Sequence, residues 1–354
     1  MEDIFIGNRK INYGLPVFII AEAGVNHNGR LDLALKLIDA AADAGADAVK
    51  FQTFKAERLV TVSGEMAEYQ KKNLKKVESQ LAMLKKLELK EEFYPKLIKR
   101  AKDRGIIFLS SPFSEVDADF LEKLRVPAYK IGSGEITNIP FLMQVAQKRK
   151  PMIVSTGMSN LKEVMEAAMA IRKAGNKQII LLHCTSNYPP SYESLNLNAI
   201  TTLRNAFKKW NIPVGYSDNG SKGVVADVAA AALGACVIEK HFTLDKKMDG
   251  PDHKASLNPK EFKNMVEAIR DTEKILGSFE KICTKEEEPI RKIARKSLVA
   301  LVNIKKGEKF AKYNLTVKRP GTGLSPKYYF NLIGKKAKKD ILADQLIKKN
   351  DYKK

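Results

Sequence analysis

Short apolar runs alternate with amphipathic stretches across residues 1–280 of this 354-residue chain. Eight runs have the length of buried strands: Val17–Ala21, Ala48–Phe51, Ile106–Leu109, Ala128–Ile131, Met152–Val154, Ile179–Leu182, Val214–Tyr216 and Ala235–Ile238. Helical patterns lie between and after them, at Leu31–Ala44, Glu91–Asp103, Leu161–Lys173, Gly223–Leu233 and Pro259–Leu276. Eight strand–helix repeats favour a closed α/β barrel, the (β/α)₈ or TIM barrel, over an open doubly wound sheet of about six strands.

Polar residues stand at or just past the end of each run. They are Glu22, Gln52, Ser110 and Ser111, Lys130 with Ser133, Ser155, His183, Ser217, and the sequence Glu239-Lys240-His241. In such barrels the loops after the strands converge at the carboxyl-terminal face and carry the active site. The pattern therefore predicts a polar site at that face.

Three lysines at these positions, Lys50, Lys130 and Lys240, supply cations, and serines supply hydroxyl donors. The glycines on either side of Ser133 allow the backbone to approach a ligand closely. Converging cations and hydroxyls suit a small anion that carries phosphate. The alternative is that each lysine pairs with a nearby carboxylate such as Glu239.

Two carboxylates, Glu22 and Glu135, are the acid–base candidates. A carboxylate crowded by lysines is normally ionised, which favours a base or a hydroxyl-orienting group over an acid. Tyr188 and Asp252 follow the sixth and eighth runs and are of the types that hold sugar hydroxyls.

The bulk composition excludes several classes of protein. No apolar run reaches 18 residues, so no membrane span is expected, and three widely spaced cysteines with no signal peptide indicate a reduced, cytoplasmic protein. The net charge of +21 raises the question of nucleic acid. Because the lysines are spread along the chain without a nucleic-acid-binding motif, we expect a lysine-rich surface and no nucleic-acid partner.

The chain divides into a barrel domain (1–280), a charged linker (281–294) and a compact, turn-rich module (295–354). Residues 55–89 are too long for a simple connection, so we interpret them as an insertion over the barrel mouth that serves as a lid or an oligomer contact.

Several ordered motifs resemble those of the bacterial and archaeal sialic acid synthase family. They are IAEAGVNHNG (20–29), VKFQT (49–53), YKIGSGE (129–135), STGM (155–158), HCT (183–185), EKHFT (239–243) and GPDH (250–253). The sequence VKRPGTG (317–323) is similar to the family's C-terminal antifreeze-like SAF domain. The resemblance implies an enzyme that joins phosphoenolpyruvate to N-acetylmannosamine or a diacetamido relative and releases phosphate, without a nucleotide cofactor.

The resemblance also implies roles, residue by residue. Phosphoenolpyruvate would be bound by Lys50, Ser111, Lys130, Ser133, Ser155, Ser186 and Ser217. The sugar would be held by Glu22, Gln52, Tyr188 and Asp252, with Glu135 in proton transfer and Glu22 and Lys130 also at the reacting centre. Arg319 would reach the sugar's acyl group from a second subunit, which predicts a domain-swapped homodimer.

Two features depart from the family pattern. Ser111 and Ser186 replace a threonine and an asparagine, which are mild changes. The family's metal-binding histidine after the seventh strand is here Asn219, while His241 matches the other ligand. Asparagine is the weaker ligand for a transition metal, so we expect a weakened or absent requirement for Mn²⁺ or Mg²⁺.

Two rival interpretations are an octulosonate- or heptulosonate-type synthase that also uses phosphoenolpyruvate, and a non-catalytic carbohydrate-binding scaffold. The first group generally lacks the SAF module, so Arg319 and its surroundings favour the nonulosonate interpretation. A catalytically inactive barrel is not favoured, because the expected residues are intact: Glu22, Lys50, Lys130, Glu135 and His241.

Overall fold

The computed structural model describes residues 3–74 and 78–352. The chain divides into two compact units, Met1–Gly277 and Ser278–Lys354, and each is described by itself. The predicted linker, 281–294, contains a helix, α13 (Glu287–Ala294), which belongs to the second unit.

The first unit contains an eight-stranded parallel sheet in the order β5-β4-β3-β10-β9-β8-β7-β6. The strands are β3 (Phe18–Gly24), β4 (Ala48–Thr53), β5 (Ile107–Pro112), β6 (Tyr129–Ile131), β7 (Met152–Ser155), β8 (Ile179–Cys184), β9 (Val214–Asp218) and β10 (Val237–His241). The last strand pairs with the first, while β5 and β6 are neighbours in space that no ladder joins within the described residues. The sheet is therefore a nearly closed barrel, as predicted.

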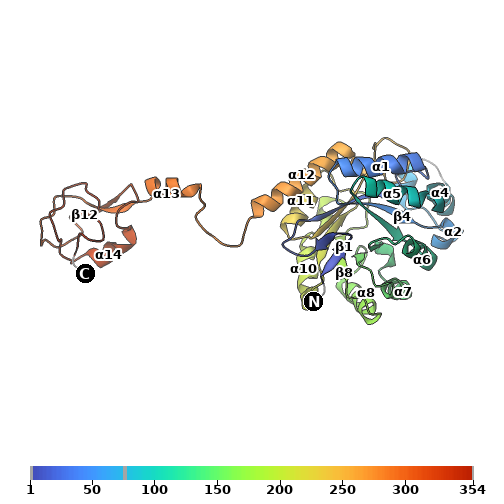
Figure 1. Cartoon of the computed structure of the whole chain (residues 1–354), viewed down its shortest axis with the longest axis horizontal. Coiled ribbons are helices and arrows are strands. Elements are labelled where there is room, and N and C mark those ends of the chain that lie inside the picture. Colours follow the sequence, from blue (N-terminus) through green and yellow to red (C-terminus); the bar gives the residue numbers. More distant parts are fainter. Residues whose placement is uncertain (1–2, 75–77, 353–354) are drawn as a thin grey trace. The chain divides into compact units, whose positions relative to one another are not determined.

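One long helix follows each strand, and these helices surround the strands (Figure 1). They are α1 (Leu31–Asp43), α5 (Tyr94–Asp103), α6 (Glu115–Lys123), α7 (Ile139–Gln147), α8 (Leu161–Lys173), α10 (Asn198–Phe207), α11 (Val225–Ala232) and α12 (Pro259–Leu276). Capping boxes start two of them at the predicted residues: Asn160 precedes α8 and pairs with Glu163 in its first turn, and Asn258 precedes α12 and pairs with Glu261 in its first turn.

Two apolar layers pack on the two sides of the barrel wall. One fills the space between the strands and the surrounding helices. The other fills the amino-terminal half of the barrel interior, where Phe18 and Ile20 pack with Ile4, Ile6 and Ile11 of the hairpin β1 (Ile4–Ile6) and β2 (Arg9–Ile11). Because the hairpin contributes to this cluster, the interior is packed at that end, and the polar side chains are left to the carboxyl-terminal half.

Seven of the eight strands end one to three residues later than the apolar runs predict. The eighth run stops at Ile238, for example, whereas β10 continues through Glu239 and Lys240 to His241. Most of the extra residues are polar, and most of these are buried inside the protein, so an apolar run underestimates these strands. The residues expected in loops are therefore fixed on rigid strands.

The insertion forms three short helices, α2 (Ala56–Leu59), α3 (Glu68–Leu74) and α4 (Gln80–Leu87). The side chain of Asn73 donates a hydrogen bond of 2.7 Å to the carbonyl of Pro251, and the Tyr69 ring stacks on Tyr188 at 4.9 Å. The insertion thus contacts the loops that follow β8 and β10, at the carboxyl-terminal face.

The second unit pairs β11 (Ser297–Ala300) with β12 (Leu315–Lys318) in antiparallel register and includes α14 (Tyr329–Leu332). Its own buried cluster includes Leu298, Phe310 and Ile347. The unit is compact and rich in turns.

Candidate functional site

The first part of the site is a buried ion pair between neighbouring strands. The ammonium of Lys50 on β4 lies 2.5 Å from Glu22 Oε2 on β3, and both side chains are 3% exposed. Lys50 Nζ also lies 3.2 Å from the hydroxyl of Ser111 on β5. The amide of Gln52 donates to Glu22 Oε1 at 3.1 Å. Four residues that the sequence predicted for the site are thus in direct contact.

The second part lies around Glu239 on β10. Lys130 Nζ, on β6, is 3.2 Å from Glu239 Oε1, and the hydroxyl of Ser217, on β9, donates to the same oxygen at 2.9 Å. Lys50 Nζ is 3.8 Å from Glu239 Oε2. One carboxylate therefore joins the two lysines inside the barrel.

Burial and the two ammonium groups set the charges of the two glutamates. Burial raises the pKa of Glu22, and the nearby Lys50 offsets only part of that effect. Burial also disfavours the charged form of Glu239, but Lys130 and then Lys50 outweigh it and lower its pKa to about 2. Burial acts against the charge of Lys50, but Glu22 and Glu239 raise its pKa overall. Glu239 and Lys50 are therefore charged at neutral pH.

Two of the predicted serines, Ser133 and Ser186, lie close to Gly157, which follows β7. The amide of Gly157 donates to the Ser133 hydroxyl at 3.1 Å. A Cβ added at Gly157 would lie 2.2 Å from Ser186 Oγ and 2.7 Å from Ser133 Oγ, so both hydroxyls approach the backbone closely there. The hydroxyl of Ser155 is buried without a hydrogen-bond partner in the described chain, so it can donate to a ligand.

Tyr188, His241 and Asp252 form another group of predicted residues. The rings of Tyr188 and His241 meet edge to face at 5.4 Å. Burial raises the pKa of Asp252 and lowers that of His241, and each partly counteracts the other's shift because the two groups attract. Among the described residues, neither Asp252 Oδ1 nor His241 Nδ1 has a hydrogen-bond partner, although both atoms are buried. These atoms can hydrogen-bond to a ligand.

Two further residues were implied to act in the site, Glu135 in the first unit and Arg319 in the second. Glu135 sits in the short 3₁₀ helix after β6, half-buried, and its Oε2 accepts from the side chain of Asn138 at 2.7 Å. Arg319 is exposed in the second unit, just after β12.

The prediction that Lys240 shares the barrel mouth with Lys50 and Lys130 is wrong. Its fully buried ammonium lies 2.8 Å from Asp218 and 3.2 Å from Asp227 on α11. Side chains alternate along a strand, so Glu239 faces the interior and Lys240 faces the helix layer. Lys240 therefore belongs to a structural ion cluster behind the barrel wall.

The two positions that the resemblance implies as metal ligands are occupied by Asn219 and His241. The amide nitrogen of Asn219 donates to the Thr185 carbonyl at 2.9 Å and to Cys184 Sγ at 3.2 Å. Throughout residues 3–74 and 78–352, no three His, Cys, Asp or Glu side chains are grouped so as to hold a metal ion. An amide ligates a metal ion through its oxygen, and one histidine with one neutral amide oxygen is a poorer ligand set for a divalent transition metal than the two histidines that the resemblance implies.

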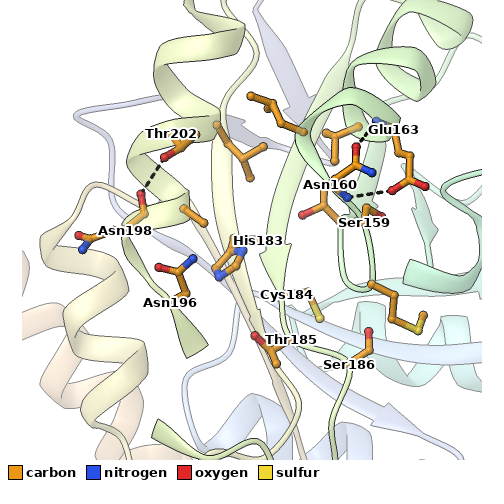
Figure 2. A pocket seen from close by; sticks show the side chains of 16 residues that line it. Ser159, Asn160, Glu163, His183, Cys184, Thr185, Ser186, Asn196, Asn198 and Thr202 are labelled. Carbon is orange, nitrogen blue, oxygen red and sulfur yellow. Dashed lines mark hydrogen bonds between the residues drawn. The ribbon is translucent and has the colours of Figure 1, made fainter. Parts of the chain in front are cut away.

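A cavity of about 860 Å³ opens beside the site. Residues at the start of α8 line one side of it, and residues at the end of β8 and in the segment after β8 line the other. Figure 2 shows His183 within it, flanked by Asn196 and Asn198 on one side and Asn160 on the other. His183 Nε2 lies 2.7 Å from the carbonyl oxygen of Leu195. Of the residues that were implied to bind a substrate, Ser186 lines this cavity.

Two residues of the site were given no role from the sequence. The sequence marked Glu239 only as a polar residue at a strand end and as a possible partner of a lysine. Neighbouring side chains on a strand point to opposite faces of the sheet, so this alternation could have placed Glu239 inside the barrel and Lys240 outside it. Tyr69 comes from the insertion and stacks on Tyr188, and no local pattern predicts that contact. No described helix is both long and apolar enough to cross a membrane.

Comparison with known proteins identifies the family. The model of the NeuB family matches residues 37–281, and the model of the SAF domain matches residues 295–353. The N,N'-diacetyllegionaminic acid synthase of Legionella pneumophila is 48% identical over 346 residues, which cover 95% of this chain and 96% of that protein. The enzyme of the same name from Campylobacter jejuni is 50% identical over 332 residues, which cover 93% of this chain and 98% of that protein.

A solved structure agrees with these matches. The N-acetylneuraminic acid synthetase of Leptospira borgpetersenii superposes with a TM-score of 0.73 at 36% identity, over 82% of this chain and 95% of that one. Because the NeuB model matches more than half of the chain and the similarity to these relatives extends over nearly their whole length, the chain belongs to the NeuB family and carries a C-terminal SAF domain.

Proposed function

We propose that the sugar used by this chain is a diacetamido sugar and that its product is of the N,N'-diacetyllegionaminic acid type. The chain is a nonulosonic acid synthase, a transferase that condenses phosphoenolpyruvate with an N-acylated amino sugar and releases phosphate. The choice of sugar is supported by the names of two relatives at 48% and 50% identity, while the solved relative at 36% identity is named for N-acetylneuraminic acid.

The observation that carries the substrate assignment is the pair of buried lysines in one barrel interior. Phosphoenolpyruvate has a carboxylate and a phosphate, so it needs two groups of positive or hydrogen-bonding character. Lys50 with Ser111, and Lys130 with Ser217, supply such groups. Ser133, Ser155 and Ser186 supply further hydroxyls, to which the phosphate would bind.

In the reaction, C3 of phosphoenolpyruvate attacks the aldehyde carbon of the open-chain sugar, and the aldehyde oxygen becomes a hydroxyl. Water adds to C2, and the bond between C2 and the phosphate oxygen breaks, so phosphate leaves with its bridging oxygen. We assign the proton of the attacking water to Glu135. Glu22, Gln52, Tyr188 and Asp252 would hold the sugar, and the paired Lys50 keeps Glu22 oriented.

The metal requirement is proposed to be weak or absent, and no step above uses a metal. The support is Asn219, which offers only a neutral amide oxygen where the family pattern has a histidine, because its amide nitrogen is a donor in two hydrogen bonds. We also propose that no nucleotide cofactor takes part. Removing bound metal with a chelator and assaying the enzyme before and after adding Mn²⁺ or Mg²⁺ tests this part of the proposal.

The assembly is proposed to be a domain-swapped homodimer in the cytoplasm, in which Arg319 reaches the sugar bound by the partner subunit. The position of Arg319 in an exposed segment of the SAF domain supports this arrangement. We propose no membrane or nucleic-acid partner. The rival octulosonate or heptulosonate interpretation is not favoured by the two family matches.

A panel of acceptor sugars tests the proposed specificity. Phosphate release from phosphoenolpyruvate is measured with a 2,4-diacetamido-2,4,6-trideoxy sugar, with N-acetylmannosamine and with its 6-phosphate. The diacetamido sugar is expected to give the highest kcat/KM. A higher kcat/KM with N-acetylmannosamine would assign the chain to the neuraminate synthases.

A further inference from the structure

Glu239 occupies the place between the two lysines that are assigned to phosphoenolpyruvate. Its Oε1 is 3.2 Å from Lys130 and its Oε2 is 3.8 Å from Lys50. We propose that Glu239 is a positioning residue that fixes the spacing of these two ammonium groups, so that one phosphorylated anion contacts both. This inference rests on the proposed substrate and adds a residue that neither the resemblance nor the comparisons assign to the site.

The first argument is the location of the carboxylate. Glu239 is on β10, Lys50 is on β4 and Lys130 is on β6, so the residues come from three strands that are not neighbours in the sheet. Their side chains meet because all three face the barrel interior, where they are 3–6% exposed. A single carboxylate therefore links distant parts of the wall at the level of the site.

The second argument is the mutual repulsion of the ammonium groups. Two like charges repel strongly where little water screens them, and lysine carries its charge on a flexible stem of four carbons. An anion between the two ammonium groups attracts both of them, and this attraction outweighs their mutual repulsion. Without Glu239, the lysines would move apart, and an incoming anion would have to bring them back together.

The third argument is an asymmetry between the two lysines. Lys50 has a second carboxylate partner, Glu22, at 2.5 Å. Among the residues that the structure describes, Lys130 forms an ion pair with Glu239 alone. The hydroxyl of Ser217 donates a hydrogen bond of 2.9 Å to Oε1 of Glu239, and this bond holds the oxygen that pairs with Lys130 in place. Glu239 must therefore act mainly through Lys130.

The experiment is a double-mutant cycle on the full-length enzyme. Glu239→Gln, Lys130→Gln and the double variant are compared with the wild type in KM for phosphoenolpyruvate, KM for the sugar and direct calorimetric binding of phosphoenolpyruvate. We expect Glu239→Gln to raise KM for phosphoenolpyruvate by about tenfold or more, as for other truncated buried charge pairs. KM for the sugar should change by less than about twofold, which is the size of effect expected when a substitution removes no contact with that substrate.

The cycle separates positioning from a general loss of structure. Because Glu239 acts through Lys130, adding Glu239→Gln to the Lys130→Gln variant should raise KM for phosphoenolpyruvate little further. Asp227→Asn is the matched control, since it neutralises a buried carboxylate 3.2 Å from a lysine that is outside the barrel interior. It should lower the unfolding midpoint and leave KM for phosphoenolpyruvate unchanged.

Several outcomes would overturn the proposal. One is an unchanged or lower KM for phosphoenolpyruvate in Glu239→Gln. The other is a double variant in which the fold-changes in KM of Glu239→Gln and Lys130→Gln multiply, because the two residues would then act independently. If Glu239→Gln does not fold, Glu239→Asp keeps the charge but withdraws it by one methylene, and it must also raise this KM. If the wild-type enzyme does not bind phosphoenolpyruvate, the proposed function is wrong. If the wild-type enzyme binds it and Glu239→Gln binds it equally well, the role of Glu239 is wrong and the proposed function stands.

Discussion

Glu22 and Lys50 are register partners on adjacent strands, and their charged groups meet at 2.5 Å inside the barrel. In parallel strands, side chains at paired positions point to the same face of the sheet. A carboxylate assigned to the sugar is therefore in contact with a cation assigned to phosphoenolpyruvate. With the proposed roles of these two residues, this contact would place the two substrates next to each other, as the joining of their carbon atoms requires.

Removing the charge of Lys50 tests its assignment to phosphoenolpyruvate. Lys50→Met should lower kcat/KM for this substrate by about 100-fold, because loss of a buried charged contact leaves both the substrate anion and Glu22 without their partner. Steady-state kinetics at a saturating sugar concentration measures the effect. Lys305→Met, an exposed lysine in the second unit, is the control and should retain wild-type kinetics. Unimpaired kcat/KM in Lys50→Met would remove this lysine from the site.

The Lys240 cluster predicts an effect on stability. Lys240→Met leaves Asp218 and Asp227 buried without a cation, so it should lower the free energy of unfolding by about 3–5 kcal/mol. Urea unfolding followed by the fluorescence of Trp210, the single tryptophan of the chain, reports on the barrel unit. Lys162→Met, on the exposed face of α8, should change this free energy by less than about 0.5 kcal/mol. Equal stabilities would show that the cluster contributes nothing.

Two buried histidines predict how stability depends on pH. Burial lowers the pKa of His27 to about 3 and that of His253 to about 4, from an ordinary value of 6.5. Below pH 6.5 the unfolded chain takes up protons at these residues that the folded chain does not, so stability falls as the pH is lowered from 6.5 toward 4. His27→Asn should reduce the slope in this window by up to about 1.4 kcal/mol per pH unit, measured by urea unfolding at a series of pH values. A slope identical to that of the wild type would contradict the burial argument.

The periodicity of the sequence predicted the barrel and the face that carries the site, because both follow from strand length and alternation. It failed where distant segments decide the outcome. The apolar run stops at Ile238, so Glu239 and Lys240 were treated as one polar strand end, although the strand continues and sends them to opposite sides. The contact of Tyr69 with Tyr188 depends on how the insertion folds back, and no residue pattern contains that information.

The neutral side chain of Asn219 predicts tolerance of chelators. Activity after treatment with a chelator and removal of the metal–chelator complex should stay within about twofold of the untreated enzyme, because an amide is a weak ligand for a transition metal. Asn219→His would restore the imidazole that the family pattern has at this position, and it should bind Mn²⁺ more tightly in calorimetry than the wild type does. Complete loss of wild-type activity that added Mn²⁺ or Mg²⁺ reverses would contradict metal independence.

The proposed swapped dimer predicts a selective effect of Arg319. Arg319→Ala should raise KM for the sugar by about tenfold or more, as for other lost charged contacts to a bound partner, and it should leave the affinity for phosphoenolpyruvate unchanged. Steady-state kinetics with each substrate varied in turn measures both values. Lys318→Ala, at the preceding and also exposed residue, is the matched control. An unchanged KM for the sugar would remove Arg319 from the proposed sugar site.

The most direct measurement uses phosphoenolpyruvate labelled with ¹⁸O at the oxygen between C2 and phosphorus, together with the diacetamido sugar. Mass spectrometry of the products should find a nonulosonic acid whose mass is the sum of the sugar and the three-carbon unit. It should also find ¹⁸O in the released phosphate, because the bond between C2 and that oxygen breaks. Absence of the nonulosonic acid, or phosphate released without the label, would contradict the reaction assigned to Lys50, Lys130 and their neighbours.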